Sequence, residues 1–137
     1  RAAKTVEEVA RDYLRLYASR KVTGDMDRLI VEQDLIPTIG AKKVVSVGRA
    51  EIQSVIRRPL ERGSPIMANR TLEIVRKLFS WAVEQGFLDA NPAEKISKPA
   101  REKPRSRALS DDEIKQIWAA TEQVSPQGRA VVRLLLL

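Results

Sequence analysis

Residues 65–86 read PIMANRTLEIVRKLFSWAVEQG and carry the most regular pattern in the chain. Apolar side chains recur in this stretch at intervals of three and four, which is typical of one helix face; they are Ala68, Leu72, Val75, Leu78, Phe79, Ala82 and Val83. Ser64 and Pro65 form a typical helix start, and Gly86 is a typical stop. The pattern predicts a helix over about 65–85.

Three shorter helices are predicted before it. Thr5 and Glu8 have the spacing of a capping box, and apolar residues follow at helical intervals to about Ser19. A second helix is expected over about 25–35, ended by Pro37, with Met26, Leu29 and Ile30 facing inward. A third is expected over about 49–61, shortened or kinked near Pro59, with Ile52, Val55, Ile56 and Leu60 inward.

The connector between the second and third helices contains Val44, Val45 and Val47. These valines could form a strand, but no partner strand is visible, so an extended connector packed on the helices is expected. The predicted fold class is therefore all-α, a small four-helix orthogonal bundle.

The last thirty residues follow a different pattern. Residues 110–113 form a second capping box, which predicts a helix with Ile114, Ile117 and Trp118 inward. A final helix starts near Pro126 and reaches the apolar run 134–137. Two helices cannot bury this surface by themselves, so we expect the incomplete helical start of another domain. The expected divisions are a helical domain over 1–92, a linker over 93–107 and this fragment over 108–137.

Composition narrows the function classes. The 137 residues carry a net charge of +7 and contain neither Cys nor His. The commonest general base and thiolate metal ligands are therefore missing, and we expect no metal site and no cofactor. No apolar run approaches the roughly 20 residues of a membrane span. The expectation is a cytoplasmic protein with nucleic acid as its leading partner.

Most of the excess positive charge lies in residues 95–107, which contain six basic residues and one acidic residue. A basic segment that also contains Pro99 and Pro104 can be a solvated linker, or a linker that also contacts phosphates. The second interpretation makes Arg101, Lys103 and Arg105 candidate DNA contacts.

The helix at 65–85 offers the other main candidates. Opposite its apolar face the sequence places Asn69, Arg70, Glu73, Arg76, Lys77 and Ser80. Asn and Arg are suited to bidentate contacts with adenine and guanine edges in the major groove. Asn69, Arg70, Arg76 and Lys77 are therefore predicted to contact DNA. Arg20 with Lys21, and Lys42 with Lys43, are predicted phosphate contacts from loops. A simply solvated face remains the alternative at each position.

Several stretches together resemble the phage integrase, or tyrosine site-specific recombinase, family. Residues 68–72, 78–86 and Asn91-Pro92 resemble its core-binding domain, a SAM-like helical fold. Residues 34–40 are similar to the loop after that domain's second helix, and 107–114 to the opening of the catalytic domain. The resemblance implies a two-domain clamp around double-stranded DNA at a core-type recombination site, acting together with other protomers of the same recombinase.

In that family a Tyr attacks the scissile phosphate without a metal, assisted by two Arg, a Lys and a His or Trp. None of this set can be placed on the sequence: Arg129 and Arg133 come too early, and the first catalytic Arg is expected beyond Leu137. Tyr13 and Tyr17 are interpreted as core or rim residues. The chain is therefore expected to bind DNA without catalysis, while its parent forms a phosphotyrosyl intermediate.

Two alternatives stay open. A non-enzymatic helical DNA-binding regulator could contain a helix-turn-helix around residues 62–65, although it would not need the basic linker and the new capped helix. A helical protein-interaction module would use its charge only for solubility, and it would not bind random duplex DNA.

Overall fold

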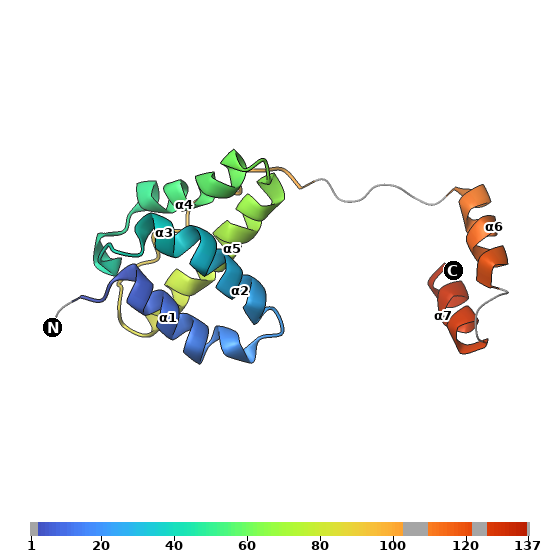
Figure 1. The fold of residues 1–137 in the computed structure, drawn as a ribbon, viewed down its shortest axis with the longest axis horizontal. Coiled ribbons are helices and arrows are strands. Elements are labelled where there is room, and N and C mark those ends of the chain that lie inside the picture. Colours follow the sequence, from blue (N-terminus) through green and yellow to red (C-terminus); the bar gives the residue numbers. More distant parts are fainter. Residues whose placement is uncertain (1–2, 103–109, 122–125, 137) are drawn as a thin grey trace. The chain divides into compact units, whose positions relative to one another are not determined.

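The computed structural model describes residues 3–102, 110–121 and 126–136. The chain divides into two compact units, Arg1–Glu102 and Lys103–Leu137. The first unit thus extends past residue 92, where we expected the first domain to end. Helices dominate both units, and within the described ranges the only β-type pairing is an isolated bridge between Thr5 and Lys43 (Figure 1).

Helix α1 (Val6–Leu16) begins with the expected capping box. The Glu8 amide donates to the Thr5 hydroxyl at 3.2 Å, and the Thr5 amide donates to the Glu8 carboxylate at 2.7 Å. These two bonds satisfy amides that the first turn would otherwise leave without a partner. The apolar face packs into the core, with Val6, Val9, Ala10 and Tyr13 fully buried. A 3₁₀ turn (Ala18–Arg20) follows the helix.

The second predicted helix is longer and differently rotated in the structure. It consists of α2 (Gly24–Ile30), a π-helical turn (Val31–Leu35) and α3 (Ile36–Ile39). The prediction that Pro37 ends this helix was wrong. The Ile36 amide bonds to the Val31 carbonyl five residues back. This wider turn makes room for a proline ring that would clash in a regular α-helix.

The inward face of this region was also predicted incorrectly in part. Met26 and Leu29 are 41% and 49% exposed, whereas Asp27 and Asp34 are buried. The cause is the hydrogen bonding of Asp27, whose carboxylate accepts from the Tyr13 hydroxyl and the Lys21 ammonium, both at 2.8 Å. With Asp27 turned inward, the buried face becomes Asp27, Ile30, Val31, Asp34 and Leu35.

A second buried carboxylate joins two distant elements. Asp34 receives a bidentate pair of hydrogen bonds from Arg62, at 2.6 and 3.0 Å, and the Arg58 guanidinium lies 3.5 Å away. The bidentate geometry satisfies both oxygens of a carboxylate that is 1% exposed. The Asp34 pair therefore ties the π-helical turn to the end of α4.

Helices α4 (Arg49–Glu61) and α5 (Pro65–Glu84) match their predictions closely and form the most extensive helix pair. Gly63 and Gly86 have φ of 76° and 80°, the left-handed region that Gly adopts without strain. Two details differ from prediction: Leu60 is 39% exposed while Pro59 is buried, and Ser64 makes no side-chain capping bond. The expected Val connector is a 3₁₀ turn (Val44–Ser46), with Val44 and Val47 buried and Val45 exposed.

The second unit contains α6 (Asp111–Ala120), with the expected capping box at Ser110, and α7 (Pro126–Leu136). No residue of α6 is buried, and Trp118, which we expected to face inward, is 38% exposed. Leu134 and Leu135 on α7 are 72% and 80% exposed. Two helices have too few neighbours to cover these faces. Across the described ranges, no helix is both long and apolar enough to cross a membrane.

Candidate nucleic-acid interface

Asn69, which we expected on the surface, is buried in the structure. Its side chain is 0% exposed, so the predicted position on the open face of α5 was wrong. The Asn69 amide nitrogen donates to the Ala100 carbonyl at 2.9 Å and to the Glu102 carboxylate at 3.0 Å, and its oxygen accepts from the Ala100 amide at 3.1 Å. These bonds use both of its donors. Asn69 therefore offers no free donor to a base edge in this conformation.

Arg76 is also engaged within the first unit. Its guanidinium donates to the backbone carbonyls of Ala93 at 3.3 Å and Ile96 at 2.6 Å, and the side chain is half-buried. Part of its donor set is therefore committed to the segment after α5. The two α5 cations that face solvent are Arg70 and Lys77. Arg70 lies 3.4 Å from Glu73, a weak exposed pair.

Lys77 borders a hollow of about 280 Å³ on the surface of α5. Tyr17, from the end of α1, lines the same hollow together with Arg76, Ser80, Trp81 and Glu84. Within the described residues, the Lys77 ammonium has neither an ion pair nor a hydrogen bond. The Tyr17 ring is 41% exposed and stacks on Tyr13 with centroids 5.2 Å apart. The hollow thus combines an available cation, an open aromatic ring and hydroxyl groups.

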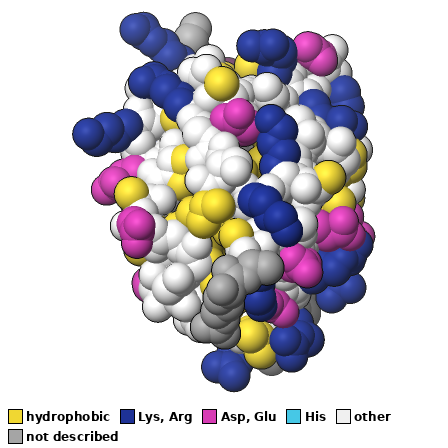
Figure 2. Space-filling view, turned by 90° about the vertical axis from the view of Figure 1, so that its left-hand side faces the viewer, with side chains coloured by type: hydrophobic (Ala, Val, Ile, Leu, Met, Phe, Trp, Pro, Cys, Tyr) yellow, Lys and Arg dark blue, Asp and Glu magenta, His cyan; other side chains and the backbone are white. Residues whose placement is uncertain are grey.

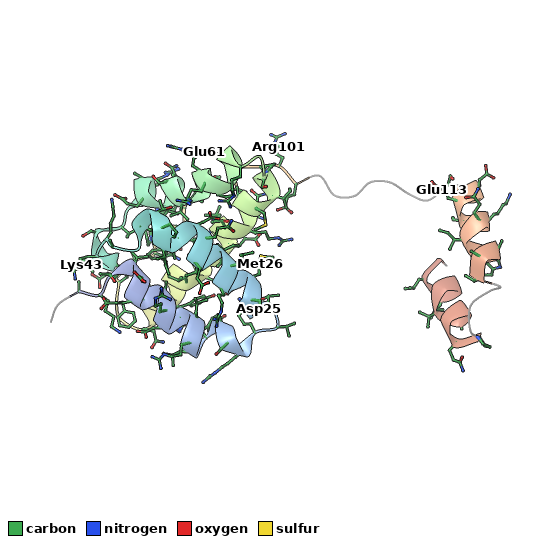
Figure 3. All side chains as sticks on the ribbon, in the orientation of Figure 1. Asp25, Met26, Lys43, Glu61, Arg101 and Glu113 are labelled. Carbon is green, nitrogen blue, oxygen red and sulfur yellow. The ribbon has the colours of Figure 1, made fainter. Side chains whose placement is uncertain are left out.

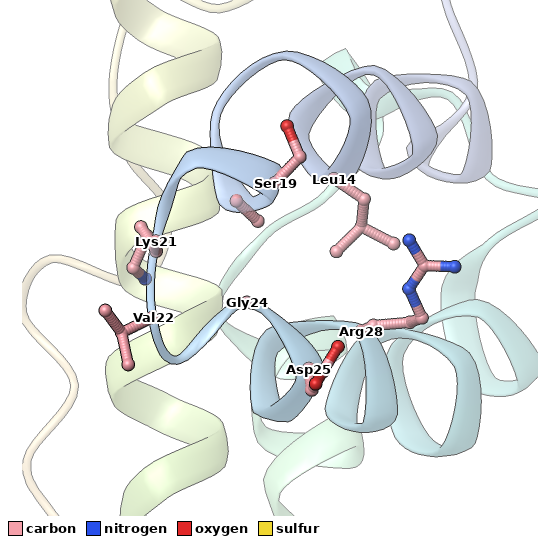
Figure 4. A pocket seen from close by; sticks show the side chains of 8 residues that line it. Leu14, Ser19, Lys21, Val22, Gly24, Asp25 and Arg28 are labelled. Atoms are coloured by element: carbon pink, nitrogen blue, oxygen red, sulfur yellow. The ribbon is translucent and has the colours of Figure 1, made fainter.

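The turn after α1 brings Lys21 to this area. Its ammonium lies 5.6 Å from the centre of the Tyr17 ring and is bonded to Asp27 at 2.8 Å. The Arg20 side chain beside it is exposed, and its guanidinium has neither an ion pair nor a hydrogen bond in the described structure. Figure 4 shows Lys21 and Val22 at the outer edge of this turn, with Arg28 on the neighbouring helix α2. The structure therefore brings both Lys21 and Lys77, predicted from separate elements, near Tyr17.

Lys42 and Lys43 lie at the other end of α1. The backbone of this loop is fixed because the Val6 amide donates to the Lys42 carbonyl at 2.9 Å and the Glu7 amide to the Gly40 carbonyl at 3.0 Å. Both side chains are exposed, and the Lys42 ammonium is 3.5 Å from Glu51. Figure 3 places Lys43 on the opposite side of the first unit from Met26. An eleven-residue helix spans about 16 Å, so these lysines form a separate candidate contact.

The basic segment after α5 is only partly described. Arg101 is exposed, while Lys103 and Arg105 lie outside the described residues. Figure 2 shows Lys and Arg side chains spread over one face of the molecule, with Asp and Glu side chains among them. Charge alone therefore does not outline one continuous patch on this face.

Sequence reasoning did not assign Tyr17 or Ser80 to a DNA contact. Tyr17 was interpreted as a core or rim residue. Its candidacy as a contact rests on its exposed ring, which lines the same hollow as Lys77. Tyr13, by contrast, is fully buried, as a core residue should be. Burial, and then its hydrogen bond to Asp27, raises the pKa of Tyr13 well above the ordinary value. A phenol held in this way is a poor nucleophile.

Comparison with known proteins identifies the family. The model of the phage integrase central domain matches residues 6–99, more than half of the chain. The chain belongs to the phage integrase family. It is 27% identical over 125 residues to the tyrosine recombinase XerC of Vibrio atlanticus, a match that covers 89% of this chain and 39% of that protein. The chain thus corresponds to well under half the length of this relative.

Two solved structures show the same fold. The phage integrase SAM-like domain of Moth 1796 from Moorella thermoacetica is 29% identical, with a TM-score of 0.61 over 76% of this chain and 92% of that one. A lambda integrase dimer bound to a COC′ core site is 19% identical, with a TM-score of 0.66 over 91% of this chain and 46% of that one. The predicted all-α, SAM-like fold class and the family resemblance are both confirmed.

Proposed function

We propose that this chain is the part of a tyrosine recombinase that grips double-stranded DNA at a core-type site. The proposal is supported by the hollow at Lys77, where an ammonium group with no ion pair or hydrogen bond among the described residues lies beside the exposed Tyr17 ring and the Ser80 side chain. Phosphate oxygens accept from such groups, and phosphate contacts supply most of the affinity for a duplex.

Other cations extend this surface. The exposed Arg20 and the partly buried Lys21 lie on the turn after α1, and the exposed Arg70 lies on α5 together with Lys77. Lys42 and Lys43 form the separate contact beyond the start of α1. Arg70 is the remaining candidate for a guanine edge, because its side chain is 54% exposed and its Glu73 contact is long. Arg76 contributes to the hollow while it holds the segment after α5. Arg101, Lys103 and Arg105 extend the proposal along the linker.

Membership of the phage integrase family supports the part of the proposal that concerns the parent protein. The lambda integrase neighbour is a dimer bound to a core site, and we propose that the parent of this chain likewise acts with further copies of itself on DNA. The parent would carry out strand exchange through a tyrosine, while the residues of this chain bind the duplex and hold it in position. A non-enzymatic DNA-binding regulator would share the grip, and the activity of the full-length protein on paired sites separates the two.

The test is a fluorescence anisotropy titration of the chain with a random-sequence duplex between about 50 and 200 mM salt. We expect log K to fall linearly with log salt concentration. Lys77→Ala should reduce that slope by about 0.9, the value of one phosphate contact. Arg11→Ala is the matched control, since Arg11 is already paired with Glu7 at 2.8 Å. Absence of binding at low salt, or equal slopes for wild type and Lys77→Ala, would contradict the proposal.

A further inference from the structure

Four polar side chains on α5 form one stripe along the helix. Asn69, Glu73, Arg76 and Ser80 follow one another at intervals of four, three and four residues, so they lie on the same side of α5. The sequence placed this stripe in solvent as part of a DNA-contacting face. In the structure, every one of the four contacts the segment that follows the helix, residues 91–102.

The contacts run in reverse order along that segment. Ser80 accepts a hydrogen bond from Asn91 at 2.8 Å, and Arg76 donates to the carbonyls of Ala93 and Ile96. Glu73 pairs with Lys98 at 2.9 Å. The segment therefore returns antiparallel to α5, as the yellow-to-orange trace in Figure 1 shows. Two apolar side chains, Ala93 and Ile96, are 0% and 6% exposed and fix it to the core.

Asn69 ends this series in the first turns of α5. Its amide group binds both the amide and the carbonyl of Ala100, a residue 31 positions away, and also reaches the Glu102 carboxylate. Glu102 is the last residue of the first compact unit. A fully buried amide with both donors and its oxygen engaged defines the position of the backbone it holds, because any shift of that backbone would leave buried polar groups without partners.

We propose that the stripe is a latch for the chain's own linker, and that Asn69 is the positioning residue that sets where the chain leaves the first unit. The segment 91–102 is then part of the first unit, and the point of departure is the Ala100–Glu102 end rather than residue 92. Asn69 acts through the Ala100 backbone and does not touch DNA. This inference goes beyond the proposed function and does not depend on it.

The test is residue-resolved amide hydrogen exchange on the whole chain without DNA. Asn69→Ala should speed exchange at the Ala100 amide by roughly tenfold or more, because a buried hydrogen-bonded contact is lost. Exchange at core amides such as those of Val75 and Leu78 should stay unchanged. Such local loss is not expected of a residue that only stabilises the whole fold, since that role would move all amides together.

Two further variants keep the test decisive if Asn69→Ala folds poorly. Glu73→Gln removes the charge that holds Lys98, at a side chain that is 33% exposed, and should loosen residues 98–100 to a smaller extent. Lys77→Ala changes the same helix without touching the segment and should leave Ala100 as in wild type. An unprotected Ala100 amide in wild type, or a parallel change at Ala100 and Val75 in these variants, would overturn the proposal.

A second arm tests the competing idea that the stripe is uncovered to read bases. Saturating duplex DNA should leave the Ala100 amide protected if the latch stays closed. Loss of that protection on adding DNA would contradict a positioning role and restore Asn69 as a base contact. If the chain binds no DNA, the proposed function fails, whereas the exchange pattern without DNA still decides the latch.

Discussion

Two buried carboxylates show how single residues define this small domain. Asp27 accepts from Tyr13 and Lys21, and Asp34 accepts from Arg62, so each joins elements that are distant in sequence. Buried charges are costly unless paired and hydrogen-bonded. The two carboxylates therefore orient the region between residues 24 and 39, even though apolar periodicity alone suggested another face.

Tyr13→Phe tests this at the residue scale. The change removes the hydroxyl that donates to Asp27 in the interior, so we expect the free energy of unfolding to fall by about 1–2 kcal/mol. Chemical denaturation measures the loss. Tyr17→Phe, directly after the end of α1, is the matched control, because Tyr17 is 41% exposed. An equal effect of both changes would contradict the role assigned to the Tyr13–Asp27 bond.

At the scale of elements, helices defined by local sequence signals were predicted well, whereas features that depend on contacts between distant residues were not. Helices α1, α4 and α5 were found because capping residues, glycine stops and apolar periodicity are local signals. The rotation of α2 was missed because it depends on the partners of Asp27. The contact between Asn69 and Ala100 was also missed, since no local pattern reports on residues 31 positions apart. The sequence offered the cations of the candidate site as DNA contacts, which stays a prediction, but it did not reveal that Asn69 and Arg76 bind the segment after α5.

Leucine-to-alanine changes in the two units should differ sharply. Leu78 is fully buried in the α5 face, so Leu78→Ala should destabilise the first unit by about 2–5 kcal/mol. Leu134 is 72% exposed on α7, so Leu134→Ala should leave the unfolding of the first unit unchanged. Thermal unfolding followed by the NMR signals of the two first-unit tyrosines provides the comparison. A large effect of Leu134→Ala on that transition would be inconsistent with separate units.

At the scale of the whole molecule, the first unit should be an independent folding unit. Its core includes Ala93 and Ile96, and its last described contacts end at Glu102. Truncation after Pro104 should therefore leave its thermal unfolding nearly unchanged, whereas truncation after Pro92 should lower it, because the 93–102 segment is lost. Calorimetry of both truncated chains decides this, and severe destabilisation by the longer truncation would refute the division.

Acid should lower the free energy of unfolding of the first unit within a narrow pH range. A hydrogen bond from Lys4 holds the pKa of Asp12 below its ordinary 3.8, and one from Lys98 holds the pKa of Glu73 below 4.5. A lowered pKa stabilises the fold above the unfolded-state value, and this contribution is lost as the pH falls through the folded-state value. Because the chain contains no His, the free energy of unfolding should stay constant between about pH 7 and 5 and decrease below about pH 4.5. Glu73→Gln should make that fall shallower in denaturation curves, and an unaltered fall would argue against the Lys98 pair.

The central claim, that the first unit grips duplex DNA through the hollow at Lys77, is tested most directly by NMR mapping of duplex binding on the whole chain. We predict that signals of Tyr17, Lys21, Lys77 and Ser80 shift on titration with duplex. The amides of Val55 and Ile56, buried on α4, should stay in place. Shifts confined to α4, or no shifts at low salt, would contradict the account.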